Sequence, residues 1–192
     1  MTELNKIENP MNTTKTKTLN IHPVTIDLKG VKSYTFQILL VGMAVALPYI
    51  AHTAGAPVRY LLPMHWAVIL AGLVYGWRSG AITGLLAPVV SFLISGMPLP
   101  HILGPMTIEL FTYGIIAGLL RESFKLNAFA SVAVALIAGR ILFVISILLF
   151  GSVSGSIPAY IQAAMLPGLA AGLAQIIILP FIAKWWVEKE RK

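Results

Sequence analysis

Long runs of apolar residues alternate with short polar or glycine-rich breaks along most of this chain. The six runs cover about residues 33–53, 61–77, 81–96, 105–120, 128–150 and 157–187. Apolar runs of about 17–25 residues predict transmembrane helices, because in lipid the backbone finds hydrogen-bond partners only within its own helix. The pattern therefore predicts an all-α fold, an integral membrane bundle of six helices in residues 33–192. The second, third and fourth runs are short, so we expect breaks, tilted helices or dipping loops there.

Basic residues lie mainly outside these runs, and their distribution predicts the orientation of the chain. If six helices alternate in direction, Arg59 stands apart on one side of the membrane. On the other side lie the basic residues of the termini and the remaining connections: Lys6, Lys15, Lys17, Lys29, Lys32, Arg78, Arg121, Lys125, Lys184, Lys189, Arg191 and Lys192. Because Lys- and Arg-rich segments stay in the cytoplasm, both termini are predicted to be cytoplasmic, in the plasma membrane of a prokaryote. Residues 1–32 are polar and are expected to form a flexible cytoplasmic tail without a cleavable signal.

The composition identifies lipid as the surroundings of most of the chain. Hydrophobic residues make up 57% of the sequence and charged residues 11%, with a mean hydropathy of +0.83, whereas soluble domains carry about 25% charged residues. The net charge of +7 comes from the tails and loops. It therefore favours anionic lipid headgroups over nucleic acid as a partner. The absence of Cys excludes disulfides, thiolate metal sites and a cysteine nucleophile.

Motifs for catalysis and for nucleotide or metal binding are missing from the sequence. No Gly-rich loop ends in Lys-Ser or Lys-Thr, so ATP hydrolysis by a P-loop is not expected. Residues 151–155 read Gly-Ser-Val-Ser-Gly, with valine where a nucleophile elbow needs serine. No two histidines have the spacing of metal ligands on a helix. The chain is therefore predicted not to be an enzyme and to bind no metal or cofactor itself.

An acid and a base, Glu109 and Arg140, lie within apolar runs. A charge at the centre of a bilayer costs about 2.5–3.5 kcal/mol on insertion scales, so such residues normally face a protein interior or a watery cavity. We expect both to lie in a polar cavity that opens to the outside. The Arg140 guanidinium suits a carboxylate, phosphate or carbonyl of a ligand, and Glu109 suits ligand amines or hydroxyls. Alternatively the two side chains pair with each other, or Glu109 caps the start of its helix.

Five further residues are candidates for the wall or rim of this cavity: His65, Trp66, His101, Tyr113 and Gln162. His65 and Trp66 lie near the start of the second run, at the outer face, where an imidazole can hydrogen-bond and an indole can stack on a heteroaromatic ring. Alternatively, Trp66 belongs to an interfacial aromatic belt. Tyr113 lies four residues after Glu109, so both share one helix face. Trp185 and Trp186 are expected to anchor the last helix at the inner interface.

The most specific motifs lie between Leu62 and Leu120. They are Pro63-Met64-His65, the glycines Gly72, Gly76, Gly80 and Gly84, Ser95-Gly96-Met97-Pro98, and Glu109-Leu110, Tyr113-Gly114 and Gly118-Leu119-Leu120. Small residues spaced by four allow helix backbones to approach closely in lipid, so close helix packing is the simplest interpretation of the glycines. With these motifs the chain resembles the substrate-binding S components of energy-coupling factor (ECF) vitamin transporters.

The resemblance implies a six-helix protein with both termini inside the cell. It implies that the chain binds a vitamin or related micronutrient from the extracellular side, with helices four to six and the loop between helices one and two. It also implies association with a transmembrane T component and two ABC ATPases, which use ATP. The first helix of the family presents small residues to the T component. Gly42, Ala44 and Ala46 match that role here, although Gly42 and Ala46 also suit packing within the bundle. A stand-alone secondary transporter or channel is the alternative, and the sequence does not select a vitamin.

Overall fold

The computed structural model describes residues 25–27, 30–150 and 156–190, and every regular element in this part of the chain is a helix. The helices are α1 (Val31–Thr53), α2 (Val58–Leu61), α3 (Pro63–Tyr75), α4 (Trp77–Ser95), α5 (Pro100–Glu122), α6 (Ala128–Phe150) and α7 (Ile157–Glu190). Five of the described helices, α1 and α4 to α7, are long and apolar enough to cross a membrane, and α3 is a shorter apolar helix. The prediction of an all-α membrane bundle with six main helices is confirmed, and the four-residue α2 is an addition.

The helix boundaries differ most from the predicted ones around the third and fourth runs. α6 spans the predicted residues 128–150. α5 begins at Pro100 rather than at residue 105, because a proline in the first turn of a helix needs no backbone donor. α4 begins at Trp77 rather than at residue 81, directly after Gly76. The φ angle of Gly76 is 82°, so this single glycine turns the chain from α3 into α4.

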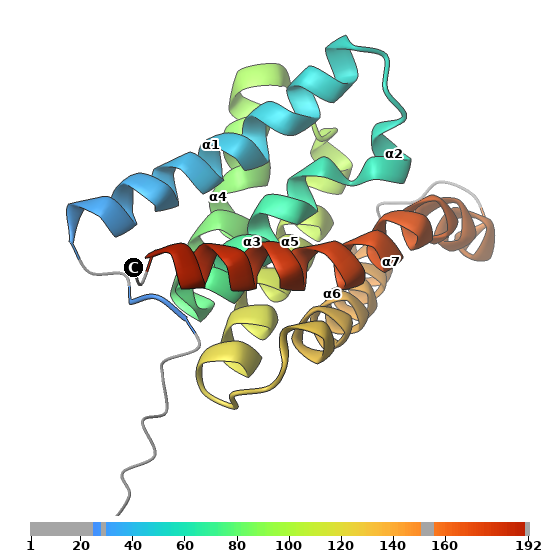
Figure 1. The fold of residues 1–192 in the computed structure, drawn as a ribbon. Coiled ribbons are helices and arrows are strands. Elements are labelled where there is room, and N and C mark those ends of the chain that lie inside the picture. The colour runs from blue at the N-terminus through green and yellow to red at the C-terminus, as the bar shows by residue number, and fades with distance from the viewer. Residues whose placement is uncertain (1–24, 28–29, 151–155, 191–192) are drawn as a thin grey trace, which may run out of the picture.

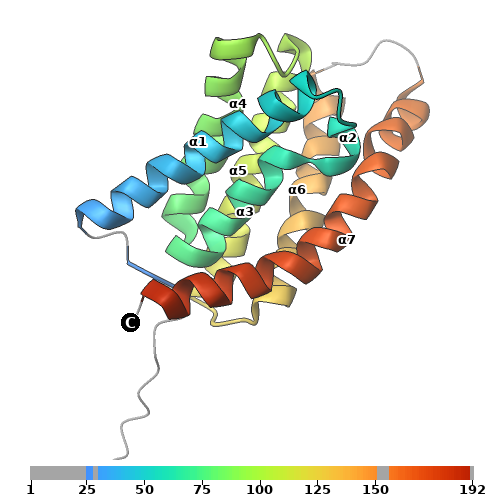
Figure 2. The ribbon, with the colours of Figure 1, turned by 45° about the horizontal axis from the view of Figure 1, so that its top comes forward.

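α3 is the central helix of the bundle. It packs against α1, α4, α5 and α7, and Figure 2 shows it between α1 and α7. All but two of its 13 residues are buried, as expected for a helix that is apolar on every face. Its fully buried Ile69 and Leu73 belong to one core with Leu40 of α1 and Leu110 of α5. The other helices are therefore arranged around a packed core that has α3 at its centre.

Glycines bring α4 and α5 into direct backbone contact. Gly80 on α4 faces Gly114 on α5, and a Cβ atom on either residue would overlap the backbone of the other. Gly84 lies in the same way against the backbone of Leu110. Close approach gains van der Waals contacts between the helices, which is the usual role of small residues at helix interfaces in membranes. The packing interpretation of the glycine spacing is confirmed at these positions.

A buried polar network joins α1 to α4. Gln37 Nε2 donates to Thr83 Oγ1 at 2.8 Å, and the Ser79 hydroxyl donates to Gln37 Oε1. Gln37, Ser79 and Thr83 are all buried. Because polar groups in an apolar interior need partners, the network fixes the position of α1 along α4.

The start of α1 and the end of α7 meet at one end of the bundle (Figure 1). Lys32 Nζ and Glu190 Oε2 are 2.7 Å apart there. One helical turn further in, Phe36 of α1, Tyr75 of α3 and Trp186 of α7 form an aromatic cluster, with the Phe36 and Trp186 ring centres 5.4 Å apart. The two ends of the helical bundle therefore lie on the same side of the molecule.

The two tryptophans of α7 have different surroundings. Trp186 is half-buried in the aromatic cluster and connects α7 to α1 and α3. Trp185 is 59% exposed, and Lys189 Nζ lies 5.0 Å from its ring centre. This pairing of an exposed indole with a cation suits an interface anchor. The sequence pattern did not separate the two residues because they are adjacent and chemically identical.

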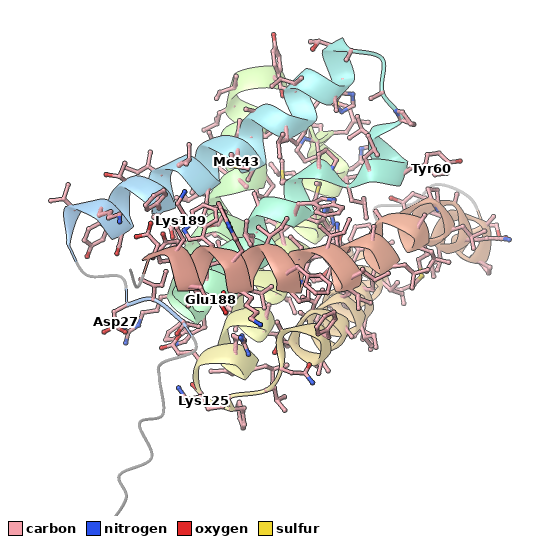
Figure 3. All side chains as sticks on the ribbon, in the orientation of Figure 1. Asp27, Met43, Tyr60, Lys125, Glu188 and Lys189 are labelled. Atoms are coloured by element: carbon pink, nitrogen blue, oxygen red, sulfur yellow. The ribbon has the colours of Figure 1, made fainter. Side chains whose placement is uncertain are left out.

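Charged residues gather where the start of α1 and the end of α7 meet. Asp27, Lys125, Glu188 and Lys189 lie toward this end, whereas Tyr60 of α2 lies toward the opposite one (Figure 3). We call the first the terminal end and the second the far end of the bundle.

Part of the predicted cytoplasmic tail packs against the terminal end. The N–H of Ile26 donates to the carbonyl of Val74 in α3 at 2.7 Å, and Thr25 is buried. Residues 1–24 and 28–29, most of the predicted tail, lie outside the described residues. The segment 25–27 therefore extends the folded part of the chain beyond the predicted start at residue 33.

Candidate ligand-binding site

A carboxylate, a phenol and a guanidinium meet inside the bundle between α5 and α6. The Tyr113 hydroxyl donates to Glu109 Oε1 at 2.6 Å, which their four-residue spacing on one helix face allows. Arg140 of α6 places Nη1 3.1 Å from the same oxygen. Glu109 is 2% exposed and Tyr113 is fully buried. The acid and the base are paired, so the buried carboxylate has the partners that a buried charge needs.

His65 of α3 lies beside these groups. Its Nε2 is 3.9 Å from Glu109 Oε1, too far for a hydrogen bond, and its ring centre is 5.3 Å from that of Tyr113. His65 is 3% exposed, and neither of its ring nitrogens has a hydrogen-bond partner within the described part of the chain. Buried polar atoms without partners are costly, and they are rare unless a ligand or water completes the site. We call His65, Glu109, Tyr113 and Arg140 the polar cluster.

The polar cluster borders a cavity of about 430 Å³, which we call the polar chamber. Its walls are formed by Leu62, His65, Ile102, Met106, Glu109, Arg140, Phe143, Tyr160 and Ala163. A second cavity of about 540 Å³, the vestibule, lies at the far ends of α1, α4 and the start of α5. The two cavities share Leu62, His65, Ile102 and Met106, so they meet at the imidazole. Both volumes lie in the range of about 300–1,000 Å³ that is typical of small-molecule sites.

Arg140 lies between the polar chamber and a third cavity. This cavity of about 510 Å³ runs between α6 and α7, and its lining is apolar apart from Arg140. Two glycines make room for the guanidinium and its helix. A Cβ at Gly139 would overlap the Tyr113 ring, and a Cβ at Gly168 would come within 2.6 Å of Arg140 Nη2. Neither glycine was predicted to belong to the site. A glycine directly before a buried arginine, as in Gly139-Arg140, is nevertheless a sequence signal for close helix packing at that position.

The polar cluster is suited to binding rather than to covalent chemistry. Glu109 already accepts from Tyr113 and Arg140, while the guanidinium has further N–H groups and a neutral imidazole offers one donor and one acceptor. No group of three His, Asp or Glu side chains within the described residues can hold a metal ion. The arrangement can therefore orient a small molecule through hydrogen bonds within mostly apolar walls.

Comparison with protein families decides what kind of protein carries this site. Residues 36–186 match the model of the family described as ECF transporter, substrate-specific component. The chain belongs to this family. It is the substrate-binding subunit of an ECF importer, a multi-pass membrane protein and a transporter subunit rather than an enzyme. The resemblance seen in the motifs is confirmed, and membership implies association with an ECF module. No curated protein and no solved structure matches the chain.

Three of the residues predicted for the site lie away from the polar chamber of this S component. The Trp66 indole donates to the carbonyl of Leu61 at 2.9 Å and ties α3 to α2. His101 is exposed in the first turn of α5, and Gln162 is exposed on α7. The positions of α7 that do border the chamber are Tyr160 and Ala163. Because successive helix residues differ by about 100° around the axis, the neighbour of a lining residue points elsewhere.

The three small residues of α1 proposed for the partner contact do not share one surface. Gly42 and Ala46 are exposed and border a cavity of about 310 Å³ between α1 and α4. Ala44 is fully buried in the core of the S component. The predicted partner contact at Ala44 is therefore corrected to packing within the bundle, because positions two residues apart on a helix lie on nearly opposite faces.

Proposed function

We propose that this S component captures a small vitamin or related micronutrient in the polar chamber and delivers it through a T component and two ABC ATPases. The observation that carries the proposal is the polar cluster at a cavity within a membrane bundle. It combines a buried acid–base pair with a histidine whose ring nitrogens have no hydrogen-bond partner among the described residues. Such groups are costly in lipid unless they serve a site. A ligand that hydrogen-bonds to the polar cluster offsets the cost of placing these groups inside the membrane.

The direction of capture follows from the placement of the basic residues. Lys125 and Lys189 lie at the terminal end, where the start of α1 and the end of α7 meet. Because basic segments remain in the cytoplasm, we assign the terminal end to the cytoplasm of a prokaryotic cell and the far end to the outside. The vestibule then opens outward, and its shared wall with the polar chamber offers the ligand a path to the cluster.

The exposed small residues of α1 are the proposed contact with the T component. A Cβ atom at Gly42 would meet nothing within 4 Å, so packing inside the described bundle does not require glycine there. Together with exposed Ala46, Gly42 forms a small-xxx-small surface on which another membrane helix can lie closely. ATP is used by the partner ATPases in this proposal, and the chain itself binds no cofactor.

Binding and transport assays test the two parts of the proposal separately. The full-length protein in detergent is expected to retain a small molecule with high affinity, and Arg140→Ala is expected to abolish retention while the variant still purifies as a folded species. Gln162→Ala, which changes an exposed residue outside the chamber, is the matched control and should bind like the wild type. If Arg140→Ala bound the small molecule with unchanged affinity, the role of Arg140 would be limited to its structural ion pair with Glu109.

Reconstitution in liposomes tests the need for partners. Uptake is expected only when the T component, both ATPases and ATP are present with the S component. Solute flux through liposomes that contain this chain alone would instead indicate a stand-alone secondary transporter or channel.

A further inference from the structure

The polar chamber holds one full charge of each sign before a ligand enters, which restricts what it can accept. From this balance and from the unpaired imidazole we infer the chemical class of the ligand. The ligand is uncharged, and it presents to His65 and Arg140 a hydrogen-bond donor next to an acceptor, as an amide, lactam or ureido group does. The inference rests on the proposed capture function and specifies the substrate of the same site.

The charge balance is set by the ion pair. Glu109 Oε1 and Arg140 Nη1 are 3.1 Å apart, with side chains 3% and 18% exposed. The remaining walls of the chamber are mostly apolar and include Ile102, Met106 and Phe143. A ligand carboxylate or phosphate would leave a net negative charge among these walls, and a ligand cation would leave a net positive one. Burying a net charge in apolar surroundings is strongly unfavourable, whereas an uncharged ligand keeps the chamber neutral.

His65 indicates which polar groups the ligand carries. Both ring nitrogens are buried and have no hydrogen-bond partner within the described residues, and the imidazole borders the polar chamber and the vestibule. A neutral imidazole has one N–H donor and one nitrogen acceptor. A ligand with an acceptor and a donor can satisfy both, and the free N–H groups of Arg140 favour a carbonyl oxygen close by. The apolar walls then suit an aromatic or aliphatic body for the rest of the molecule.

Retention of compounds from complex nutrient extracts tests the inference. The purified full-length protein is incubated in detergent at pH 7 with a mixture of yeast extract and meat extract, washed and denatured, and the released compounds are identified by mass spectrometry. The expected compound is uncharged at pH 7 and carries adjacent N–H and carbonyl or ring-nitrogen groups. His65→Phe keeps a ring but removes both nitrogens, and it is expected to reduce retention at least tenfold. Gln162→Ala should retain the same compound in the same amount.

A second variant keeps the test decisive if His65→Phe does not fold. His65→Gln retains a donor and an acceptor and is expected to hold more of the compound than His65→Ala. Retention of a carboxylate, a phosphate or a cation would overturn the inference while the capture function stands. Equal retention by wild type and His65→Phe would also overturn it. A wild-type protein that retains no compound would contradict the capture function itself, and the inference with it.

Discussion

Replacing Arg140 by Met separates the structural contribution of the polar cluster from its contribution to binding. The substitution keeps a long apolar stem but leaves Glu109, which is 2% exposed, without the guanidinium 3.1 Å from its Oε1. Removing one partner of a buried ion pair costs about 3–5 kcal/mol in proteins. The matched variant is the double replacement Arg140→Met with Glu109→Gln, which removes both charges and keeps a polar side chain beside Tyr113.

Protonation of the Glu109 carboxyl limits how much stability the Arg140→Met variant can lose. Neutralising a carboxyl with an ordinary pKa of about 4.3 costs about 3.7 kcal/mol at pH 7, at about 1.4 kcal/mol per pH unit. We therefore expect Arg140→Met to lose about 3–4 kcal/mol at pH 7, or about 6–16 °C in melting temperature for a chain of this size. The folded variant then holds a proton that the unfolded chain has released, so lowering the pH to 5 recovers about 2–3 kcal/mol. The double variant leaves no unpaired charge and is expected within about 1 kcal/mol of wild type.

Thermal unfolding of the full chain in detergent, followed by the fluorescence of its four tryptophans, measures these differences. Ligand retention is measured on the same preparations, and both variants are expected to lose it because the guanidinium is gone. The reasoning is refuted if the single and double variants melt at the same temperature at pH 7. It is also refuted if the difference in melting temperature between the two variants does not narrow at pH 5.

Three further predictions use the same unfolding assay. Gly114→Ala places a methyl group against the backbone of α4 and should cost about 1–3 kcal/mol, whereas Gly104→Ala meets open space and should be neutral or stabilise by up to about 1 kcal/mol; equal melting temperatures would contradict the close crossing of α4 and α5. Gln37→Leu removes the hydrogen bonds between α1 and α4 and should cost about 1 kcal/mol; a melting temperature at or above that of wild type would show that the network adds no stability. Trp186→Ala opens the aromatic cluster and should cost about 2 kcal/mol, less than the loss of a fully buried Trp. Trp185→Ala should stay within about 0.5 kcal/mol, and the reverse order would contradict the assignment of the two tryptophans.

The sequence predicted those features that arise because polar and charged groups are unfavourable in lipid. α6 was located at both ends because its apolar run is bounded by polar and glycine-containing segments. Glu109 and Arg140 were identified for the same reason, since a charge inside an apolar run needs a partner or a cavity. Their pairing had to remain one of two alternatives, because it depends on how α5 and α6 are rotated toward each other. That rotation is set by glycines such as Gly139, whose neighbours across the interface are not evident from the sequence.

The sequence did not predict which residues of the apolar helices border the cavities. α7 is apolar on all sides, so no polar stripe indicates its inward face, and Gln162 was chosen where Tyr160 and Ala163 line the chamber. In α1, small residues were grouped by their spacing, although the core takes Ala44 and leaves Gly42 exposed. The start of α5 was placed five residues late, at Pro105, which lies inside the helix. Each of these differences concerns rotation or helix ends, which tertiary packing decides.

The shortness of α3 has a consequence for the cavities at the far end of the bundle. Its 13 residues reach about 20 Å, whereas the hydrocarbon layer is about 30 Å thick. Tyr75 brings the helix to the aromatic cluster at the terminal end, so the missing height of about 10 Å falls at the far end. The shortfall is closed by α2 and by Leu62, which borders the polar chamber, the vestibule and the cavity between α6 and α7. Substitutions in α2 and at Leu62 therefore change the shape of these cavities, while the buried core around α3 is left in place.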